Sequence, residues 1–170
     1  MIMLRSAVQT ILQRELAAVR RSVEAYPDDA SLWTQRAGLP NAGGTLVLHI
    51  AGNLQHYVGA LLGGTGYVRN RDAEFARREV SRDELLAEID AAADAVDQGL
   101  SRLSDDDHAL VGVYPERIAG REVATGDYLV HLASHLAYHL GQLDYHRRVV
   151  TGRRDGVAAV APAELPVRAS

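Results

Sequence analysis

The stretch HLASHLAYHLGQLDYH, residues 131–146, decides the fold of this 170-residue chain. Histidines occupy positions 131, 135, 139 and 146, and leucines occupy positions 132, 136, 140 and 143. At about 100° per residue on a helical wheel, each set falls within one narrow arc, and the two arcs adjoin. The stretch therefore predicts a long helix whose leucines face a hydrophobic core and whose histidines border that core.

Three further segments repeat their apolar residues at steps of three and four, which is the pattern of an amphipathic helix. Ser81 and Glu84 form a capping box at the start of one of them. Thr45 is the expected N-cap of another, and Thr125 or Asp127 is the expected N-cap of the histidine-rich helix. The four predicted helices cover residues 3–23, 46–62, 82–103 and 128–150.

The segments between these helices show no alternation typical of β-strands, and the chain has no internal repeat. Residues 111–124, which include Pro115 and Gly120, predict extended or irregular backbone. We therefore expect an all-α fold, an antiparallel four-helix bundle, formed by residues 1–152 as a single domain. Residues 153–170 are small, charged or proline-containing and predict a loose C-terminal tail.

The composition excludes several classes of chemistry. The chain has no cysteine, which excludes a cysteine nucleophile, an iron–sulfur centre and a thiolate-ligated zinc site. All 18 basic residues are arginine, which excludes a lysine Schiff base and a lysine-dependent phosphate loop. A chain of this length buries a core without the help of disulfides.

The charge pattern gives no indication of a nucleic acid partner, because 22 acidic residues outnumber the arginines and the arginines are scattered. The longest weakly charged stretch, residues 37–67, contains asparagine, glutamine, histidine and many glycines, so no membrane span is expected. Polar residues interrupt the N-terminal segment where a signal peptide needs an apolar run. We expect a cytoplasmic protein whose partner is a small-molecule substrate.

Two histidines of the long helix have the spacing of a metal-binding pair. His135 and His139 are four residues apart, so their imidazoles lie one turn above the other and reach a common point. His131 and His135 have the same spacing but lie further from the leucine arc. A third ligand must come from another helix, and His49, in an apolar frame, is the best candidate. Three imidazoles suit a late divalent metal such as Zn, Ni, Co or Cu and leave a coordination position open for catalysis.

The same residues also have plainer interpretations. Histidines on a helix are often ordinary core or surface residues, and Tyr57, Tyr128 and Tyr138 are either proton donors at a pocket or packing residues. Gln142, one turn beyond the histidine pair, either hydrogen-bonds near a metal ligand or is a plain helix residue. The arginine-rich segment 69–78 either meets an acidic cofactor or is solvated.

Three stretches of the sequence resemble one known family. HLASHLAYHLGQL (131–143) is similar to the C-terminal signature of the DinB-like (DinB/YfiT) superfamily of metal-binding four-helix bundles, and LHIAGNLQHY (48–57) is similar to its second-helix motif. RNRDAEF (69–75) is similar to the small DinB-like proteins that have no assigned reaction. The resemblance implies that His49, His135 and His139 hold one divalent ion, Zn or Ni, with an open position, and that the chain forms a homodimer.

The resemblance also implies chemistry with a low-molecular-weight thiol such as bacillithiol, mycothiol or glutathione. A metal-bound thiol is deprotonated at neutral pH, so a chain without cysteine still presents a thiolate nucleophile. We therefore predict a metal-dependent S-transferase that acts on a small electrophile. The alternatives are a hydrolase that uses a metal-bound water and a non-catalytic metal-binding or dimerising bundle. The non-catalytic bundle would show a fourth protein ligand, for example His131 or His56.

Overall fold

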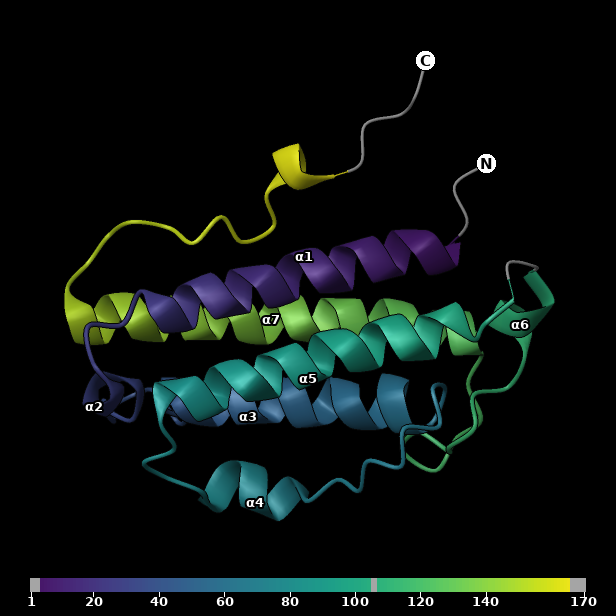
Figure 1. Cartoon of the computed structure of the whole chain (residues 1–170), viewed down its shortest axis with the longest axis horizontal. Coiled ribbons are helices and arrows are strands. Elements are labelled where there is room, and N and C mark those ends of the chain that lie inside the picture. The colour runs from purple at the N-terminus through teal and green to yellow at the C-terminus, as the bar shows by residue number, and fades with distance from the viewer. Residues whose placement is uncertain (1–3, 105–106, 166–170) are drawn as a thin grey trace.

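The computed structural model describes residues 4–104 and 107–165, and it shows the expected all-α fold (Figure 1). A π-helical segment, η1 (Gln55–Ala60), continues the helix that begins at Gly43 without a break. No helix in the two described ranges is long and apolar enough to cross a membrane. The four long helices are α1 (Leu4–Glu24), α3 (Gly43–Leu54), α5 (Arg82–Ser101) and α7 (Thr125–Thr151).

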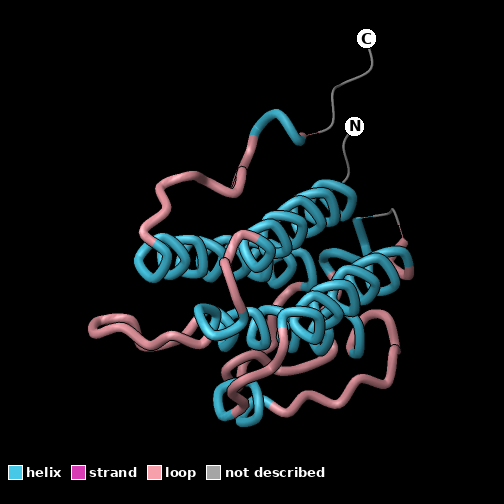
Figure 2. Tube along the Cα trace, turned by 60° about the vertical axis from the view of Figure 1, so that its left-hand side comes forward, coloured by secondary structure: helices cyan, strands magenta, loops and turns pink. Residues whose placement is uncertain are grey.

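The connections between the long helices carry short helical elements that the sequence did not predict, because so few residues show no usable hydrophobic period. Figure 2 shows helices and loops alone in the part of the chain that the structure describes. Residues 111–124 are predicted to be extended or irregular. Val111 is the last residue of α6 (Asp107–Val111), and the rest of the segment contains two isolated antiparallel bridges, Val113–Ala124 and Ile118–Arg121. The short elements are α2 (Asp29–Leu32), α4 (Arg71–Ala76), α6 (Asp107–Val111) and the 3-10 helix η2 (Pro162–Glu164).

The directions of the long helices correct the prediction of an antiparallel bundle. α1 runs antiparallel to α5, and α3 runs antiparallel to α7, whereas α3 and α5 run parallel and so do α1 and α7 (Figure 1). The reason is the connection 61–81, which returns along the bundle through α4 before α5 begins. A long connection of this kind permits parallel neighbours, whereas short loops enforce antiparallel ones.

The hydrophobic core confirms the predicted orientation of the α7 leucines. Each of them is at most 1% exposed, and they pack with apolar residues of the other long helices. The predicted capping box at Ser81 and Glu84 is also present at the start of α5. The leucine arc of α7 thus faces the bundle axis, as the wheel indicates, and the buried leucines are Leu129, Leu132, Leu136, Leu140 and Leu143.

The predicted N-caps of α3 and α7 are wrong. α3 begins at Gly43, and Thr45 is buried in its first turn. Neither predicted residue caps α7, because its N-cap is Ala124 and Thr125 is its first helical residue. The early start of α3 depends on tertiary packing, since a Cβ at Gly43 would lie only 2.5 Å from the hydroxyl oxygen of Tyr26.

The described part of the C-terminal segment, residues 153–165, packs against α1, although the sequence predicts a loose tail there. The Nε atom of Arg21 donates to the carbonyl oxygen of Val157 at 2.9 Å, and the Val157 side chain is 6% exposed. The backbone N–H of Val160 donates to the buried carboxylate of Glu15 at 3.0 Å. These α1 side chains provide partners for tail backbone groups that form no regular structure of their own.

Small residues allow η1 and α5 to approach closely. A Cβ at Gly99 of α5 would overlap the carbonyl oxygen of Val58. A Cβ at Gly59 of η1 would lie 2.7 Å from the Cβ of Ala95. The backbones therefore touch at this crossing, which anchors the end of the helix that begins as α3.

We expect Gly99→Ala to lower the free energy of unfolding by about 1–3 kcal/mol, because the added methyl group overlaps the Val58 carbonyl oxygen. Gly141→Ala is the matched control, since a Cβ at this α7 glycine meets nothing within 4 Å. Helix propensity should raise the free energy of unfolding there by about 0.5–1 kcal/mol. Thermal unfolding followed by circular dichroism measures the stability of both variants. Equal changes in stability in Gly99→Ala and Gly141→Ala would contradict the close contact between Gly99 and Val58.

Candidate metal centre

The packing of α3 against α7 brings three histidines together. The ring nitrogens of His49, His135 and His139 that face the group all lie within 4.8 Å of one another. The Nε2 atom of His135 lies 3.1 Å from Nε2 of His139 and 3.4 Å from Nε2 of His49. The structure thus places side by side the three residues that the sequence analysis proposes as ligands.

Two of these separations, 3.1 and 3.4 Å, fit a divalent metal ion. Imidazole nitrogens bind zinc at about 2.0–2.1 Å, so two of them in a tetrahedral site lie about 3.3 Å apart. A donor set of three imidazoles without a carboxylate suits a late divalent metal such as Zn or Ni. Among the residues described, the group holds three ligands, which leaves a coordination position for an exogenous molecule.

Hydrogen bonds fix the orientation of two of the imidazoles. Nδ1 of His49 lies 2.9 Å from Oε2 of Glu74, and Nδ1 of His139 lies 2.7 Å from Oε1 of Gln142. Both partners are oxygen acceptors, so each Nδ1 carries the proton and donates it, and each Nε2 keeps its lone pair. These lone pairs face the His135 ring, where a bound cation would meet them.

Glu74 is itself held by Arg69. Nε of Arg69 donates to Oε1 of Glu74 at 2.7 Å, and Nη2 donates to Oε2 at 2.9 Å, which is a bidentate pair. Burial alone would raise the pKa of Glu74, but the hydrogen bonds from His49 and Arg69 lower it below its usual value. Glu74 is therefore a carboxylate at neutral pH, and it accepts the hydrogen bond from Nδ1 of His49.

The short helix α4 places Glu74 against His49. Asn70 caps α4, and its side chain accepts a hydrogen bond from a first-turn backbone N–H at 3.0 Å. A Cβ at Gly52 of α3 would overlap Oε1 of Glu74, so the glycine makes room for the carboxylate. The position of the carboxylate thus depends on a cap in one element and a missing side chain in another.

The environment keeps the α7 histidines in the form that binds metal. Burial, together with the neighbouring His139 and His49, lowers the pKa of His135 to about 4. Burial also lowers the pKa of His139, against the hydrogen bond to Gln142, which raises it. Both rings are therefore neutral at pH 7, which is the form in which an imidazole binds a metal ion.

Other histidines of the two helices lie outside the group. His131 is exposed and stacks on Tyr128, with the ring centroids 5.5 Å apart. His56 lies 3.2 Å from the carboxylate of Glu116. His146 shares the histidine arc of the helical wheel, but it is buried two turns beyond the group and hydrogen-bonded at both ring nitrogens.

The tyrosines named in the sequence analysis differ in their roles. Tyr57 and Tyr128 pack against each other, with ring centroids 5.3 Å apart. Burial raises the pKa of Tyr128 well above its usual value, so its hydroxyl stays protonated. Tyr138 is 64% exposed, and its ring centroid lies 5.2 Å from that of His139. Packing therefore accounts for the first two, and Tyr138 stands at the surface beside the histidine group.

The pairing of His49 with Glu74 and Arg69 was not predicted. Both residues lie in the stretch 69–75 on which the family resemblance rests, but no spacing within that stretch connects them to a histidine in another helix. A carboxylate that orients a ligand histidine is a common feature of metal sites. The rule predicts that a ligand histidine has a carboxylate partner, but it does not say which of the 22 acidic residues is that partner.

The model of the DinB superfamily matches residues 11–143, a range that contains the three histidines and Glu74. The chain belongs to the DinB superfamily. A crystal structure of a DinB-like protein from Bacillus cereus resembles it with a TM-score of 0.59 and 17% sequence identity, over 81% of this chain and 86% of that chain. At this identity the likeness concerns the fold alone. A search of curated proteins found no match.

We expect this DinB-superfamily chain to bind about one zinc or nickel ion. His49→Ala, His135→Ala and His139→Ala should each abolish binding without unfolding the chain, because each removes one of three ligands. Plasma mass spectrometry of untagged protein, purified without chelators, measures the metal, and circular dichroism reports the fold. The matched control is His131→Ala, which removes an exposed imidazole one turn from His135 and should retain the ion. Retention by His49→Ala would contradict the three-histidine site.

We expect Glu74→Gln to weaken zinc binding by about 10–100-fold, because the carboxylate that orients His49 is lost. Competition with a chromophoric chelator measures the dissociation constant. Glu116→Gln is the control, since it changes a carboxylate that contacts His56, a histidine outside the group. An unchanged dissociation constant for zinc in Glu74→Gln would show that His49 binds the metal without the hydrogen bond to this carboxylate.

Proposed function

We propose that this chain is a metal-dependent S-transferase that joins a low-molecular-weight thiol to a small electrophile. The observation that carries the proposal is the convergence of three imidazoles, with no fourth protein ligand among the described residues, in a chain without cysteine. Three imidazole ligands leave room for an exogenous ligand. A thiol is such a ligand, and its sulfur supplies the nucleophile that the chain lacks.

The chain's own residues set the conditions for this chemistry. A divalent ion, Zn or Ni, bound to the three imidazoles would make the thiol a thiolate at neutral pH. Glu74 and Gln142 hold the His49 and His139 rings by their Nδ1 atoms. His49 is 7% exposed, whereas His135 and His139 are half-buried, so reactants reach the group from the α7 side.

The proposed reaction is a substitution at carbon. The thiol sulfur forms a bond to an electrophilic carbon of the substrate, and the leaving group departs with its electron pair. The proton of the thiol passes to solvent. The reaction therefore needs no oxidant and no cofactor beyond the metal ion and the thiol.

Hydrolysis by a metal-bound water has less support. It requires a general base, and Glu74 is the carboxylate in contact with the group. Both oxygens of Glu74 already accept hydrogen bonds, from His49 and Arg69, and its lowered pKa makes it a weak base. The positions of His131 and His56 outside the group likewise favour catalysis over a saturated, non-catalytic site.

We also propose a homodimer that works in the cytoplasm. Membership of the superfamily supports the dimer, and a reducing compartment keeps low-molecular-weight thiols in the thiol form. Analytical ultracentrifugation of the metal-loaded protein measures the association state directly.

We expect zinc- or nickel-loaded protein to accelerate the reaction of monochlorobimane or 1-chloro-2,4-dinitrobenzene with at least one of glutathione, mycothiol and bacillithiol. Fluorescence or absorbance of the thioether measures the rate above that in buffer. His135→Ala should lose the acceleration, because one of three ligands is gone. His131→Ala should keep it.

Rates equal to those in buffer, for all three thiols and both metals, would refute the S-transferase. Full activity in His135→Ala would also refute it, since the reaction would then be independent of the histidine group. Metal-dependent cleavage of p-nitrophenyl acetate without any thiol would favour the hydrolase instead.

A further inference from the structure

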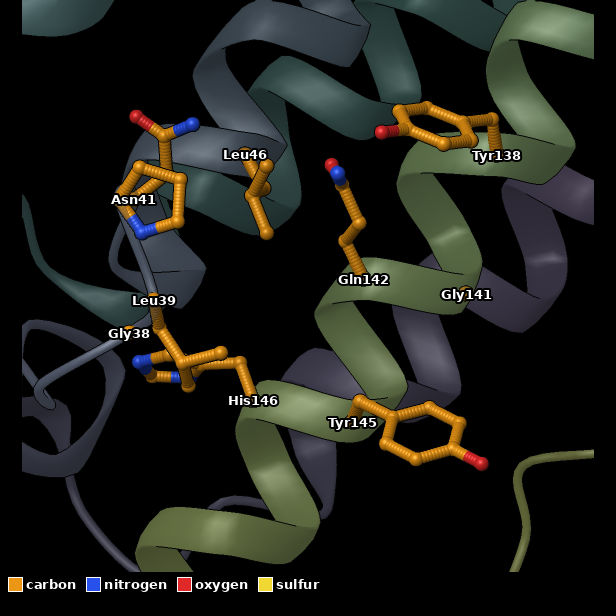
Figure 3. A pocket seen from close by; sticks show the side chains of 10 residues that line it. Gly38, Leu39, Asn41, Leu46, Tyr138, Gly141, Gln142, Tyr145 and His146 are labelled. Atoms are coloured by element: carbon orange, nitrogen blue, oxygen red, sulfur yellow. The ribbon is translucent and has the colours of Figure 1, made fainter.

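A pocket of about 420 Å³ lies on α7 one turn beyond His139, facing the segment that leads into α3 (Figure 3). Leu39, Asn41 and Leu46 stand on one side of it, and Tyr138 and Gln142 of α7 stand on the other. The volume is typical of a site for a small organic molecule. None of the three histidines of the metal centre lines this pocket.

The pocket differs from other hollows of the surface in its charge. Among the residues described, no arginine, aspartate or glutamate lines it, although such residues make up 24% of the chain. Four other hollows each have at least one charged side chain in their lining, namely Asp94, Glu79, Glu74 and Asp72. An ionic ligand would therefore find no opposite charge in the pocket.

His146 lines the pocket but adds no charge. Its Nε2 donates to the carbonyl oxygen of Thr34 at 2.8 Å, and its Nδ1 accepts from the hydroxyl of Tyr26 at 2.7 Å. Burial lowers the pKa of His146 below its usual value. Both ring nitrogens are thus occupied, and the imidazole presents only carbon atoms to a ligand.

Hydrogen-bond donors remain available inside this uncharged lining. Oε1 of Gln142 accepts from His139, so the amide NH₂ of Gln142 is left to donate. Within residues 4–104 and 107–165, the Asn41 amide and the Tyr138 hydroxyl have no hydrogen-bond partner. Figure 3 shows the Tyr138 hydroxyl and the end of the Gln142 side chain directed into the space that Leu46 and Asn41 border.

We propose that this pocket binds an uncharged, largely apolar small molecule that carries one hydrogen-bond acceptor. Its apolar part contacts the apolar walls, and the acceptor meets the Gln142 amide. A charged molecule would lose part of its hydration without gaining an opposite charge. Gln142 also accepts a hydrogen bond from His139, so this residue connects the pocket to the histidine group. That the ligand is the electrophile of the reaction rests on the proposed function, whereas its chemical class rests on the pocket alone.

The test compares two nearly isosteric probes, the neutral ketone 2-acetonaphthone and the anion 2-naphthoate. Ligand-observed NMR measures both dissociation constants, and the ketone should bind at least about tenfold more tightly. Gly141→Phe should weaken ketone binding at least about tenfold, because position 141 borders the pocket and a side chain there enters open space. The control is Ser134→Phe, an exposed site two turns back on the same face of α7 and outside the lining, which should bind normally.

The outcomes separate this proposal from the S-transferase. Ketone binding that persists in His135→Ala, where the reaction should fail, supports the pocket independently of the metal. Absence of ketone binding to the wild type overturns the pocket even when the transferase assay succeeds. Equal losses in Gly141→Phe and Ser134→Phe overturn it as well. A changed sedimentation coefficient in Gly141→Phe, with no ketone binding to the wild type, assigns the surface to a second copy of the chain instead.

Discussion

Three imidazole nitrogens directed at one point between two helices are the constraint on which the rest of the site depends. Nε2 of His135 lies 3.1 Å from Nε2 of His139 and 3.4 Å from Nε2 of His49, and burial lowers the pKa of His135, so that this ring is neutral at neutral pH. Both distances are near the separation of about 3.3 Å that two nitrogens have on one tetrahedral zinc ion. The arrangement therefore suits a metal-binding site.

The surroundings of the group show how much of the molecule serves this arrangement. Glu74 orients His49, Arg69 holds Glu74, and Gly52 makes room for the carboxylate. Glu74 lies on α4, within the long connection that also makes α3 and α5 parallel. The connection therefore has two consequences. It sets the topology of the bundle, and it supplies the carboxylate that fixes a ligand histidine.

One helix, α7, contributes to both the histidine group and the neighbouring pocket. His139 belongs to the group and Gln142 belongs to both, because its amide oxygen holds His139 while its amide nitrogen borders the pocket. A metal-bound nucleophile and an uncharged electrophile would thus meet over one turn of helix. Such proximity is the main contribution that a rigid scaffold makes to a reaction between two small molecules.

The sequence by itself determined the all-α class, the inward leucines of α7, the capping box of α5 and the pair His135 and His139, because these features follow from residue spacing along a single helix. His49 was named from its apolar surroundings in the sequence and from the family resemblance, because no spacing within one helix connects it to that pair. Only the tertiary structure decided the helix directions, the first turn of α3, the partnership of Glu74 with His49 and the pocket beside Gln142. Each of these depends on residues from different elements, such as Gly43 against Tyr26. Periodicity reports which face of a helix is buried, and it carries no information about which residue of another element lies opposite that face.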